Sequence, residues 1–145
     1  MRVSDVLASK GSNEVFTISP DATVADLLDT LAELNVGALV VSTDGSTIIG
    51  IVSERDIVRK LRTVENARSL PVSRIMTSAD ELHVCSPTDS FGVLMSLMTE
   101  QRIRHVPVLE DDRVVGVLSI GDAVKYRMDQ LEFERDQLTN YVAGG

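Results

Sequence analysis

The sequence predicts an α/β (α+β) protein built from two β-α-β-β-α repeats that pack against each other, followed by an extended C-terminal helix. Three observations predict this class. An apolar strand, a glycine, a Ser-x-x-Asp and a helix occur at residues 48–58 and return at residues 114–124. Helical apolar spacing alternates with strand-like runs in both halves. A unit repeated at this period cannot bury its apolar face alone and packs against its copy.

The duplication extends beyond the two motifs. Residues 3–7 match residues 72–76, and residues 17–20 match residues 84–87. The offset falls only from 69 residues (Val3 to Val72) to 66 residues (Gly50 to Gly116), which small loop adjustments explain. We therefore divide the chain into a first repeat (1–62), a connection (63–71), a second repeat (72–128) and a helical extension (129–145).

Local signals place the elements of the first repeat. A short strand at 15–18 is stopped by Pro20. Thr23 then caps a helix that carries Asp26 at its third position, as in a capping box. Asp44-Gly45 is a strong hairpin signal between strands 38–42 and 47–52, and a helix follows over 54–61.

The second repeat follows the same order. Its predicted elements are a strand at 83–85, a helix at 91–100, strands at 106–109 and 113–118, and a helix from Ile120 onward.

Composition narrows the function classes. The chain has 145 residues, of which 43% are hydrophobic and 3% aromatic with no Trp, and a formal net charge of −8. So few aromatics argue against base-stacking platforms, and the acidity opposes phosphate-backbone binding by the whole surface. The single cysteine suits a reducing compartment. Without a membrane-length apolar run or a signal-peptide pattern, the expectation is a cytoplasmic protein with no nucleic-acid or membrane partner.

Two readings fit the pairs Ser53 with Asp56 and Ser119 with Asp122. A Ser followed three residues later by an acid is a capping box, which requires no ligand. However, both repeats use Asp rather than the longer Glu, and both motifs follow a glycine that would let a ligand approach the backbone. A helix N-terminus suits a phosphate, and a carboxylate one turn on suits the hydroxyls of a ribose.

This pattern resembles a tandem pair of cystathionine-β-synthase (CBS) domains, a Bateman module, over residues 3 to about 128. The resemblance implies two units packed about a pseudo-twofold axis, with two clefts for adenosine nucleotides. It also implies that Asp56 and Asp122 hold ribose hydroxyls and that Ser53 and Ser119 face phosphate. The base would be held by backbone at Thr17, Ile18, Gly37 and Ala38 in one cleft, and at Val84, Cys85, His105 and Val106 in the other.

Lys10, Arg55 and the run from Arg102 and Arg104 through His105 to Pro107 resemble a stand-alone bacterial subgroup of CBS pairs linked with AMP, ATP or NAD. Each cation has the alternative of being an ordinary solvated side chain. The second repeat has Gly121 where the first has Arg55. Its site must therefore borrow charge from Arg102 or Arg104, take a less charged ligand, or stay empty.

The remaining reactive side chains give no enzyme signature. His83 and Cys85 alternate on a predicted strand with His105 as a possible neighbour, but a metal site would need further ligands. A buried thiol and ordinary histidines are the alternative that we adopt. We see no base and orienting acid for a nucleophile, so we predict no metal, no catalytic cofactor and no enzyme activity.

The last helix carries apolar residues at alternating spacings of four and three, with a charged interruption at Arg135. They are Val124, Met128, Leu131, Leu138 and Val142. Such a seam is typical of a dimerisation or partner-docking helix, and the alternative is an amphipathic helix lying back on its own domain. The family resemblance favours a homodimer.

Together these features predict a regulatory sensor of energy or redox state that binds an adenosine nucleotide between its repeats and signals to a downstream protein. The rival from another class is a constitutive scaffold dimer in which the Ser-x-x-Asp pairs are only helix caps. A nucleotide-processing enzyme is a third class, for which the sequence supplies no catalytic group.

Overall fold

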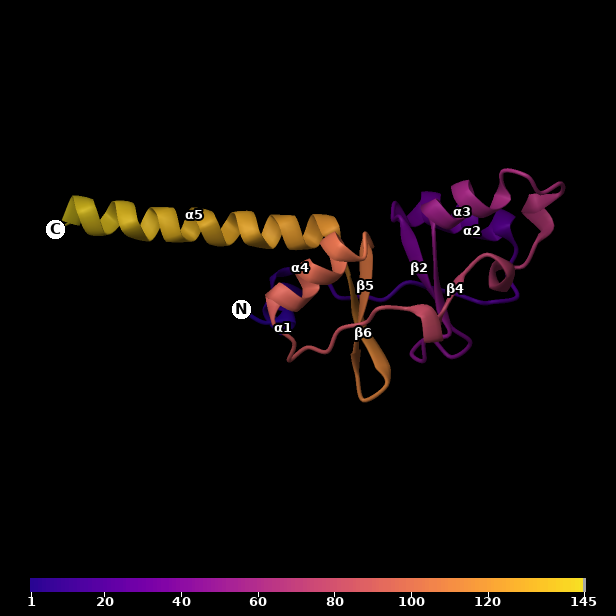
Figure 1. Ribbon diagram of the computed structural model, residues 1–145, viewed down its shortest axis with the longest axis horizontal. Coiled ribbons are helices and arrows are strands. Elements are labelled where there is room, and N and C mark those ends of the chain that lie inside the picture. Colours follow the sequence, from indigo (N-terminus) through magenta and orange to yellow (C-terminus); the bar gives the residue numbers. More distant parts are fainter. Residues whose placement is uncertain (145) are drawn as a thin grey trace.

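The computed structural model describes residues 1–144 as two α/β units lying side by side, with one long helix leaving the second unit (Figure 1). The helices are α1 (Val3–Ser9), α2 (Val24–Leu34), α3 (Glu54–Leu61), α4 (Phe91–Glu100) and α5 (Ile120–Gly144). The strands are β1 (Thr17–Ile18), β2 (Ala38–Val41), β3 (Gly50–Ser53), β4 (Thr77–Ser78), β5 (His105–Glu110) and β6 (Arg113–Ser119). Short 3₁₀ turns lie at Ala67–Ser69, Val72–Arg74 and Ala79–Glu81. The predicted fold class is confirmed.

The first unit is a four-stranded sheet in the order β1-β2-β3-β4. Strand β1 runs parallel to β2, and the other neighbours are antiparallel. Helices α2 and α3 lie together beside this sheet (Figure 1). Leu27 of α2 and Leu39 and Val52 of the sheet are almost fully buried in one core. Burying these apolar faces is the main force that holds helix and sheet together.

The second unit has its own sheet and its own core. Strands β5 and β6 form an antiparallel pair with a register shift between Val108 and Leu109. Leu94 of α4, Val106 of β5 and Leu118 of β6 are fully buried together. The molecule therefore contains two cores, one for each sheet.

The two units exchange their first segments. Helix α1 packs into the core of the second unit through Val3 and Val6, and the turn at 72–74 packs into the first core through Val72. The backbone hydrogen bonds are reciprocal at matched residues. Val3 N–H donates to Asp89 O (2.8 Å) and Val72 N–H to Ala22 O (2.8 Å); Ser4 N–H donates to Pro87 O and Ser73 N–H to Pro20 O. Each repeat thus completes the core of the other, and the packed units cross the repeat boundaries of the sequence.

Two predicted strands need correction. The strand expected from residue 47 begins at Gly50, because the Asp44 carboxylate accepts the N–H groups of Ser46 (2.8 Å) and Thr47 (2.7 Å) and so removes them from the ladder. The strand expected at 83–85 is not formed. Cys85 alone makes an isolated bridge, with Val108, and its N–H donates to Pro107 O (3.0 Å).

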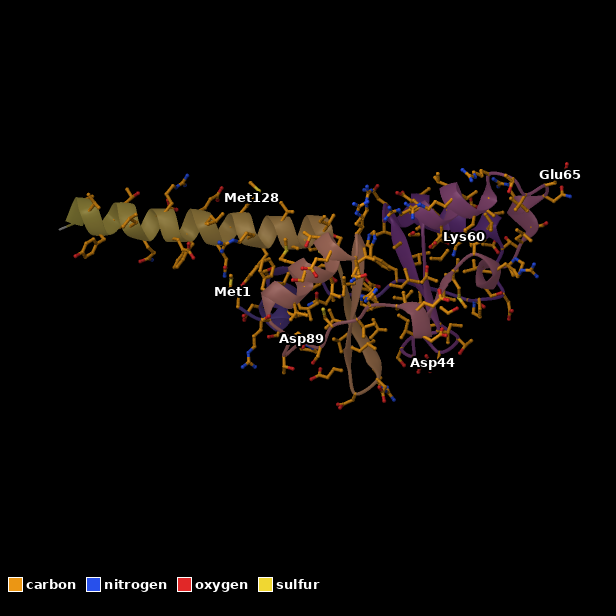
Figure 2. All side chains as sticks on the ribbon, viewed as in Figure 1. Met1, Asp44, Lys60, Glu65, Asp89 and Met128 are labelled. Atoms are coloured by element: carbon orange, nitrogen blue, oxygen red, sulfur yellow. The ribbon has the colours of Figure 1, made fainter. Side chains whose placement is uncertain are left out.

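Helix α5 extends far from the body as a single rod (Figure 1), and side chains project from it on all sides beyond Met128 (Figure 2). The alternative in which this helix lies back on its own domain is wrong, because every residue from 131 to 144 is exposed. Within residues 1–144 no helix has the length and apolar run needed to cross a membrane.

Candidate functional site

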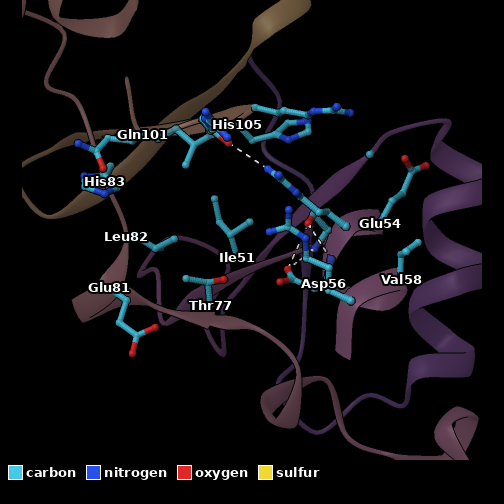
Figure 3. A pocket seen from close by; sticks show the side chains of 17 residues that line it. Ile51, Glu54, Asp56, Val58, Thr77, Glu81, Leu82, His83, Gln101 and His105 are labelled. Carbon is cyan, nitrogen blue, oxygen red and sulfur yellow. Dashed lines mark hydrogen bonds between the residues drawn. The ribbon is translucent and has the colours of Figure 1, made fainter. Parts of the chain in front are cut away.

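A cleft of about 780 Å³ lies between the two units. Figure 3 shows Glu54, Asp56 and Val58 on one side, His83, Gln101 and His105 on the other, and Ile51, Thr77 and Leu82 between them. Small-molecule sites are usually concavities of about 300–1,000 Å³ with apolar walls and a few polar groups, and this cleft has those properties. It is larger than the pocket beside the second Ser-x-x-Asp motif, which measures about 240 Å³.

The cleft gathers positive charge in an acidic protein. Arg55, Arg59, Arg102 and Arg104 line it together with three carboxylates, Glu54, Asp56 and Glu81. The whole chain has a net charge of −8. A local excess of guanidinium groups in a concave site attracts anions and offers bidentate hydrogen bonds to phosphate.

Ser53 and Asp56 form a complete capping box at the start of α3. Ser53 N–H donates to Asp56 Oδ2 (2.9 Å), and Asp56 N–H donates to Ser53 Oγ (3.3 Å). The other carboxylate oxygen, Asp56 Oδ1, lies 3.5 Å from Lys60 Nζ, one helical turn further on. Lys60 also donates to Ile75 O (2.8 Å), which ties α3 to the chain leading into the second repeat.

Arg55 links the two sides of the cleft. Its Nη1 donates to the carbonyl oxygen of Arg102 (3.0 Å). The backbone of Arg102 has a φ of 54°, in the left-handed region that residues other than glycine rarely adopt. Such strain is often stored at functional sites, and Arg102 lines the cleft just before β5.

His105 lies where the two units touch. Its Cε1 is 3.5 Å from the position that a Cβ on Gly37 would take, with Glu54 Oε2 at 3.6 Å from the same point. Burial lowers the pKa of His105, and the charges of Arg104 and Lys10 act in the same direction, against Asp122 and Glu54. The imidazole is therefore neutral at neutral pH.

The second Ser-x-x-Asp motif lies in a different environment. Ser119 N–H donates to Asp122 Oδ2 (2.8 Å), and that oxygen also lies 3.1 Å from Lys10 Nζ. Burial acts to raise the pKa of Asp122, but the Ser119 N–H and Lys10 outweigh it and hold the pKa below its ordinary value. The pocket beside this motif measures about 240 Å³, and Lys10 and Asp122 both line it. Its carboxylate is already neutralised by the protein's own lysine.

The structure brings together part of the predicted site. The predicted residues that line the large cleft are Gly37, Ser53, Arg55, Asp56, Arg102, Arg104 and His105. Lys10 and Asp122 line the small pocket instead. Those lining neither are Thr17, Ile18, Ala38, Val84, Cys85, Val106, Pro107 and Ser119.

Two of the backbone carbonyl groups expected to hold a base accept hydrogen bonds from neighbouring strand segments instead. Ile18 O accepts from Ser42 N–H (3.0 Å), and Cys85 O accepts from Leu109 N–H (2.8 Å). Cys85 and Val106 are buried in the second core. Burial and the nearby Asp89 raise the pKa of the Cys85 thiol to about 11, so it is a neutral core side chain rather than a reactive group.

Some cleft residues were missed by sequence reasoning. They are Ile51, Glu54, Val58, Arg59, Thr77, Glu81, Leu82, His83, Gln101 and Ile103. The segment from Thr77 to His83 belongs to the second repeat in sequence, but it follows the exchanged turn and so lines the cleft of the first motif. The similarity between the two halves of the sequence does not reveal that the repeats exchange their first segments.

Neither the glycine before each motif nor the use of Asp in it indicates a ligand, contrary to the expectation from sequence. The glycines before the motifs do not leave room for a ligand. A Cβ on Gly50 would meet Thr77 O at 2.7 Å and Met76 Sδ at 2.8 Å, and one on Gly116 would meet Leu7 Cδ2 at 2.6 Å. The choice of Asp over Glu does not argue against capping either, because Thr23 with Asp26 also forms a complete box.

No group of three His, Cys, Asp or Glu side chains is arranged to hold a metal ion anywhere in residues 1–144. His83 is exposed at the cleft and Cys85 is buried in the core, so these two side chains do not share a face.

Comparison with known proteins identifies two copies of one domain in this chain. The family model of the CBS domain matches residues 3–63 and again residues 72–129. A mitochondrial CBS domain-containing protein of Arabidopsis thaliana is 36% identical over 149 residues, which cover 99% of this chain and 72% of that protein.

Solved structures share the same architecture. A CBS-domain containing protein from Agrobacterium tumefaciens has a TM-score of 0.80 at 36% identity, covering 88% of this chain and 99% of that one. A CBS domain protein from Pyrobaculum aerophilum, solved in complex with AMP, has a TM-score of 0.72 at 29% identity, covering 84% of this chain and 89% of that one.

Proposed function

The chain belongs to the CBS domain family, as its duplicated motifs predicted, and from that premise we propose that it is a non-catalytic regulatory module binding an adenosine nucleotide in the large cleft. The observation that carries this proposal is the composition of the cleft. One wall supplies Ser53, Arg55 and Asp56 at a helix N-terminus, and the other supplies Arg102 and Arg104. Binding there requires both repeats at once.

Each part of a nucleotide has a partner in this arrangement. The Asp56 carboxylate suits the two ribose hydroxyls, since it accepts hydrogen bonds and is only 14% exposed. The N-terminus of α3 and the surrounding arginines suit the phosphate groups. Ile51, Leu82 and Ile103 supply apolar surface for an adenine ring.

The number of arginines in the cleft suits ligands with more phosphate charge than a monophosphate carries. AMP, ATP and NAD all share the adenosine and at least one phosphate, and the AMP complex of the Pyrobaculum aerophilum relative supports the adenosine part. Four arginines offer more charge than one phosphate monoester requires. ATP or NAD would use this surplus, which suits a sensor of energy or redox state.

Signalling would arise from the contact between the two walls. The Arg55 guanidinium donates to Arg102 O across the cleft in this structure. A phosphate that attracts Arg55 would compete with this bond and change the spacing of the repeats. A ligand shifts such an equilibrium only by its difference in affinity for the two states, so the effect should increase with phosphate charge.

The pocket at the second motif takes no nucleotide in this proposal. It is about a third as large as the cleft, and Lys10 lies 3.1 Å from the Asp122 carboxylate, closer than the 3.5 Å between Lys60 and Asp56. We place the protein in the cytoplasm, because the unpaired Cys85 suits a reducing compartment. We also propose that it is a homodimer and that it signals to a downstream protein.

The second candidate is a constitutive scaffold dimer without a ligand. The complete capping boxes favour it, because Ser53 and Asp56 have a structural role that requires no nucleotide.

The deciding experiment is isothermal titration with AMP, ATP and NAD on the full chain and on Asp56→Ala. Asp26→Ala is the matched control, because Asp26 closes the same kind of box on α2 but lies outside the cleft. Both variants should lose some stability as a capping box is opened, and only Asp56→Ala should lose nucleotide binding.

Three results would count against the proposal. Binding that survives Asp56→Ala would exclude the assigned ribose contact. Absence of heat from millimolar AMP, ATP and NAD with folded protein would favour the scaffold dimer. Conversion of the added nucleotide, seen as a new peak on ion-exchange chromatography, would make the protein an enzyme.

A further inference from the structure

Helix α5 has two parts with different surroundings. Its first turns pack on the body, where Ala123 is fully buried and the Tyr126 ring lies 5.4 Å from that of Phe91. Every residue from 131 to 144 is exposed. An isolated helical segment of this length is marginally stable in water, so the projecting part needs something to pack against.

An exposed apolar stripe runs the length of the helix. It consists of Val124, Met128, Leu131, Leu138 and Val142, each between 46% and 72% exposed. Tyr126 lies two residues from both Val124 and Met128, which is about 200° around the helix. The stripe therefore faces away from the protein's own body, and the labelled Met128 side chain projects outward in Figure 2.

Charged residues flank the stripe in a sign pattern that changes along the helix. Arg127 and Glu134 lie on one flank, and Lys125 and Glu132 lie on the other. On each flank the cation precedes the anion by one heptad. When a second copy of this helix runs in the opposite direction, its anions lie beside the cations of the first copy and its cations beside the anions. Two antiparallel copies are therefore complementary in charge.

We propose that α5 pairs antiparallel with α5 of a second copy of this chain, with Met128 facing the partner's Leu131. In this register Val124 faces the partner's Arg135, and Gly121 faces the partner's Leu138. This pairing does not depend on nucleotide binding, so it can be tested independently of the cleft.

Charge selects this register among the antiparallel ones. Arg127 meets the partner's Glu134, and Lys125 meets the partner's Glu132, each twice by symmetry. A shift by one heptad toward the C-termini would oppose Glu134 to the partner's Glu134. A shift in the other direction would oppose Arg127 to the partner's Arg127. Only the proposed register has four attractive pairs and no repulsive one.

Arg135 disfavours the parallel alternative. In a parallel pair in register, the two Arg135 side chains would face each other within the apolar seam, where neither charge is neutralised. In the antiparallel pair each Arg135 lies across from Val124, and its long stem can cover the apolar stripe while the guanidinium reaches water.

The same pairing gives a reason for Gly121, the residue that replaces Arg55 in the second repeat. A Cβ at Gly121 would have only Ser119 Oγ nearby, at 3.6 Å, so no contact within the chain requires a glycine there. The proposed register brings the partner's Leu138 against this position. A glycine leaves space for that leucine.

Disulfide trapping in the full chain tests the orientation. Two variants are prepared, Val124→Cys and Arg135→Cys, with the buried Cys85 left in place. In the proposed pair, residue 124 faces residue 135 of the partner, whereas like residues are about 16 Å apart along the axis. Disulfides require Cα atoms within about 7 Å. The oxidised mixture should therefore give covalent dimers, and neither variant alone should.

Each other outcome overturns the proposal. Covalent dimers from either variant alone would indicate a parallel pair. A dimeric mass for the unmodified protein without trapping in the mixture would place the interface on the repeats. A monomeric mass by sedimentation at 100 µM would mean that the stripe has no second copy as partner.

Charge exchange supplies a second test that introduces no cysteine. Glu134→Arg alone should weaken the dimer at least tenfold and increasingly so at low salt, because it places Arg next to the partner's Arg127. Arg127→Glu combined with Glu134→Arg should restore the dimer in the antiparallel register. In a parallel pair the double variant would instead oppose residue 127 to the partner's Glu132 and stay weak, which would contradict the proposal.

Discussion

Leu7 lies against Gly116 so closely that a Cβ on the glycine would stand 2.6 Å from Leu7 Cδ2. Met76, the matched residue of the second repeat, has the same relationship to Gly50, at 2.8 Å from Sδ. Both glycines therefore admit a side chain from the segment that the other repeat contributes. The exchange of segments, rather than a ligand, explains the glycine in each motif.

This relationship predicts unequal costs for two alanine substitutions. Gly50→Ala should lower the free energy of unfolding by about 1–3 kcal/mol, because the added methyl also meets the backbone carbonyl of Thr77 at 2.7 Å. Gly116→Ala should cost less, since only the end of a leucine side chain must move. Urea unfolding of both variants measures the difference. Gly92→Ala, at an exposed position of α4, is the control and should gain up to about 1 kcal/mol. A Gly50→Ala protein of unchanged stability would contradict the packing.

The Lys10–Asp122 pair predicts a dependence of stability on pH. The pKa of Asp122 is below its ordinary value of 3.8 in the folded protein, so the unfolded chain binds a proton first as pH falls. The stabilisation is complete above about pH 5 and is lost as the pH falls through the folded pKa. Lys10→Met should remove up to about 1 kcal/mol of it at pH 7 and less at pH 3.

Lys125→Met is the matched control for that pair. Lys125 lines the same small pocket, but its partner Asp129 is exposed on α5 at 3.5 Å. Urea unfolding at both pH values should show almost no change for this variant. Equal losses for the two lysine variants would show that the position of Lys10 beside Asp122 has no special effect.

His105 predicts a second pH effect at higher pH. Its lowered pKa means that the unfolded chain takes up the proton first, near pH 6.5. The free energy of unfolding should therefore fall as the pH decreases from about 7 toward 5, because burial and the charges of Arg104 and Lys10 outweigh Asp122 and Glu54 at the His105 ring. His105→Gln should flatten this slope in urea unfolding, and His83→Gln, an exposed position, should keep it. Equal slopes in the two variants would rule out a buried neutral His105.

Local structure followed closely from local sequence. The helix at 91–100 begins and ends where its apolar spacing predicted, and the Thr23 cap with Asp26 forms as expected. The strand predicted at 83–85 failed because only Cys85 finds a backbone partner there. Whether a short extended run becomes a strand depends on its neighbours across the sheet, which the run itself does not encode.

The candidate site was predicted only in part, for a related reason. Ser53, Arg55 and Asp56 lie within four residues of one motif and reach the cleft together, so their position follows from one strand-to-helix junction. Lys10 was expected beside a nucleotide but pairs with Asp122, which lies more than a hundred residues later in the chain. Leu82 and His83 enter the first cleft from the second repeat.

The sequence by itself determined the duplication, the α/β class, the capped helices and the apolar stripe of α5, because periodicity and capping act between residues a few positions apart. The tertiary structure alone decided that the repeats exchange their first segments, that the motif glycines admit Leu7 and Met76, and that one Ser-x-x-Asp faces the large cleft while the other lies beside a small pocket lined by Lys10. These relationships depend on which surfaces pack together. Two repeats of one pattern can complete their own cores or each other's, and only the folded chain distinguishes the two.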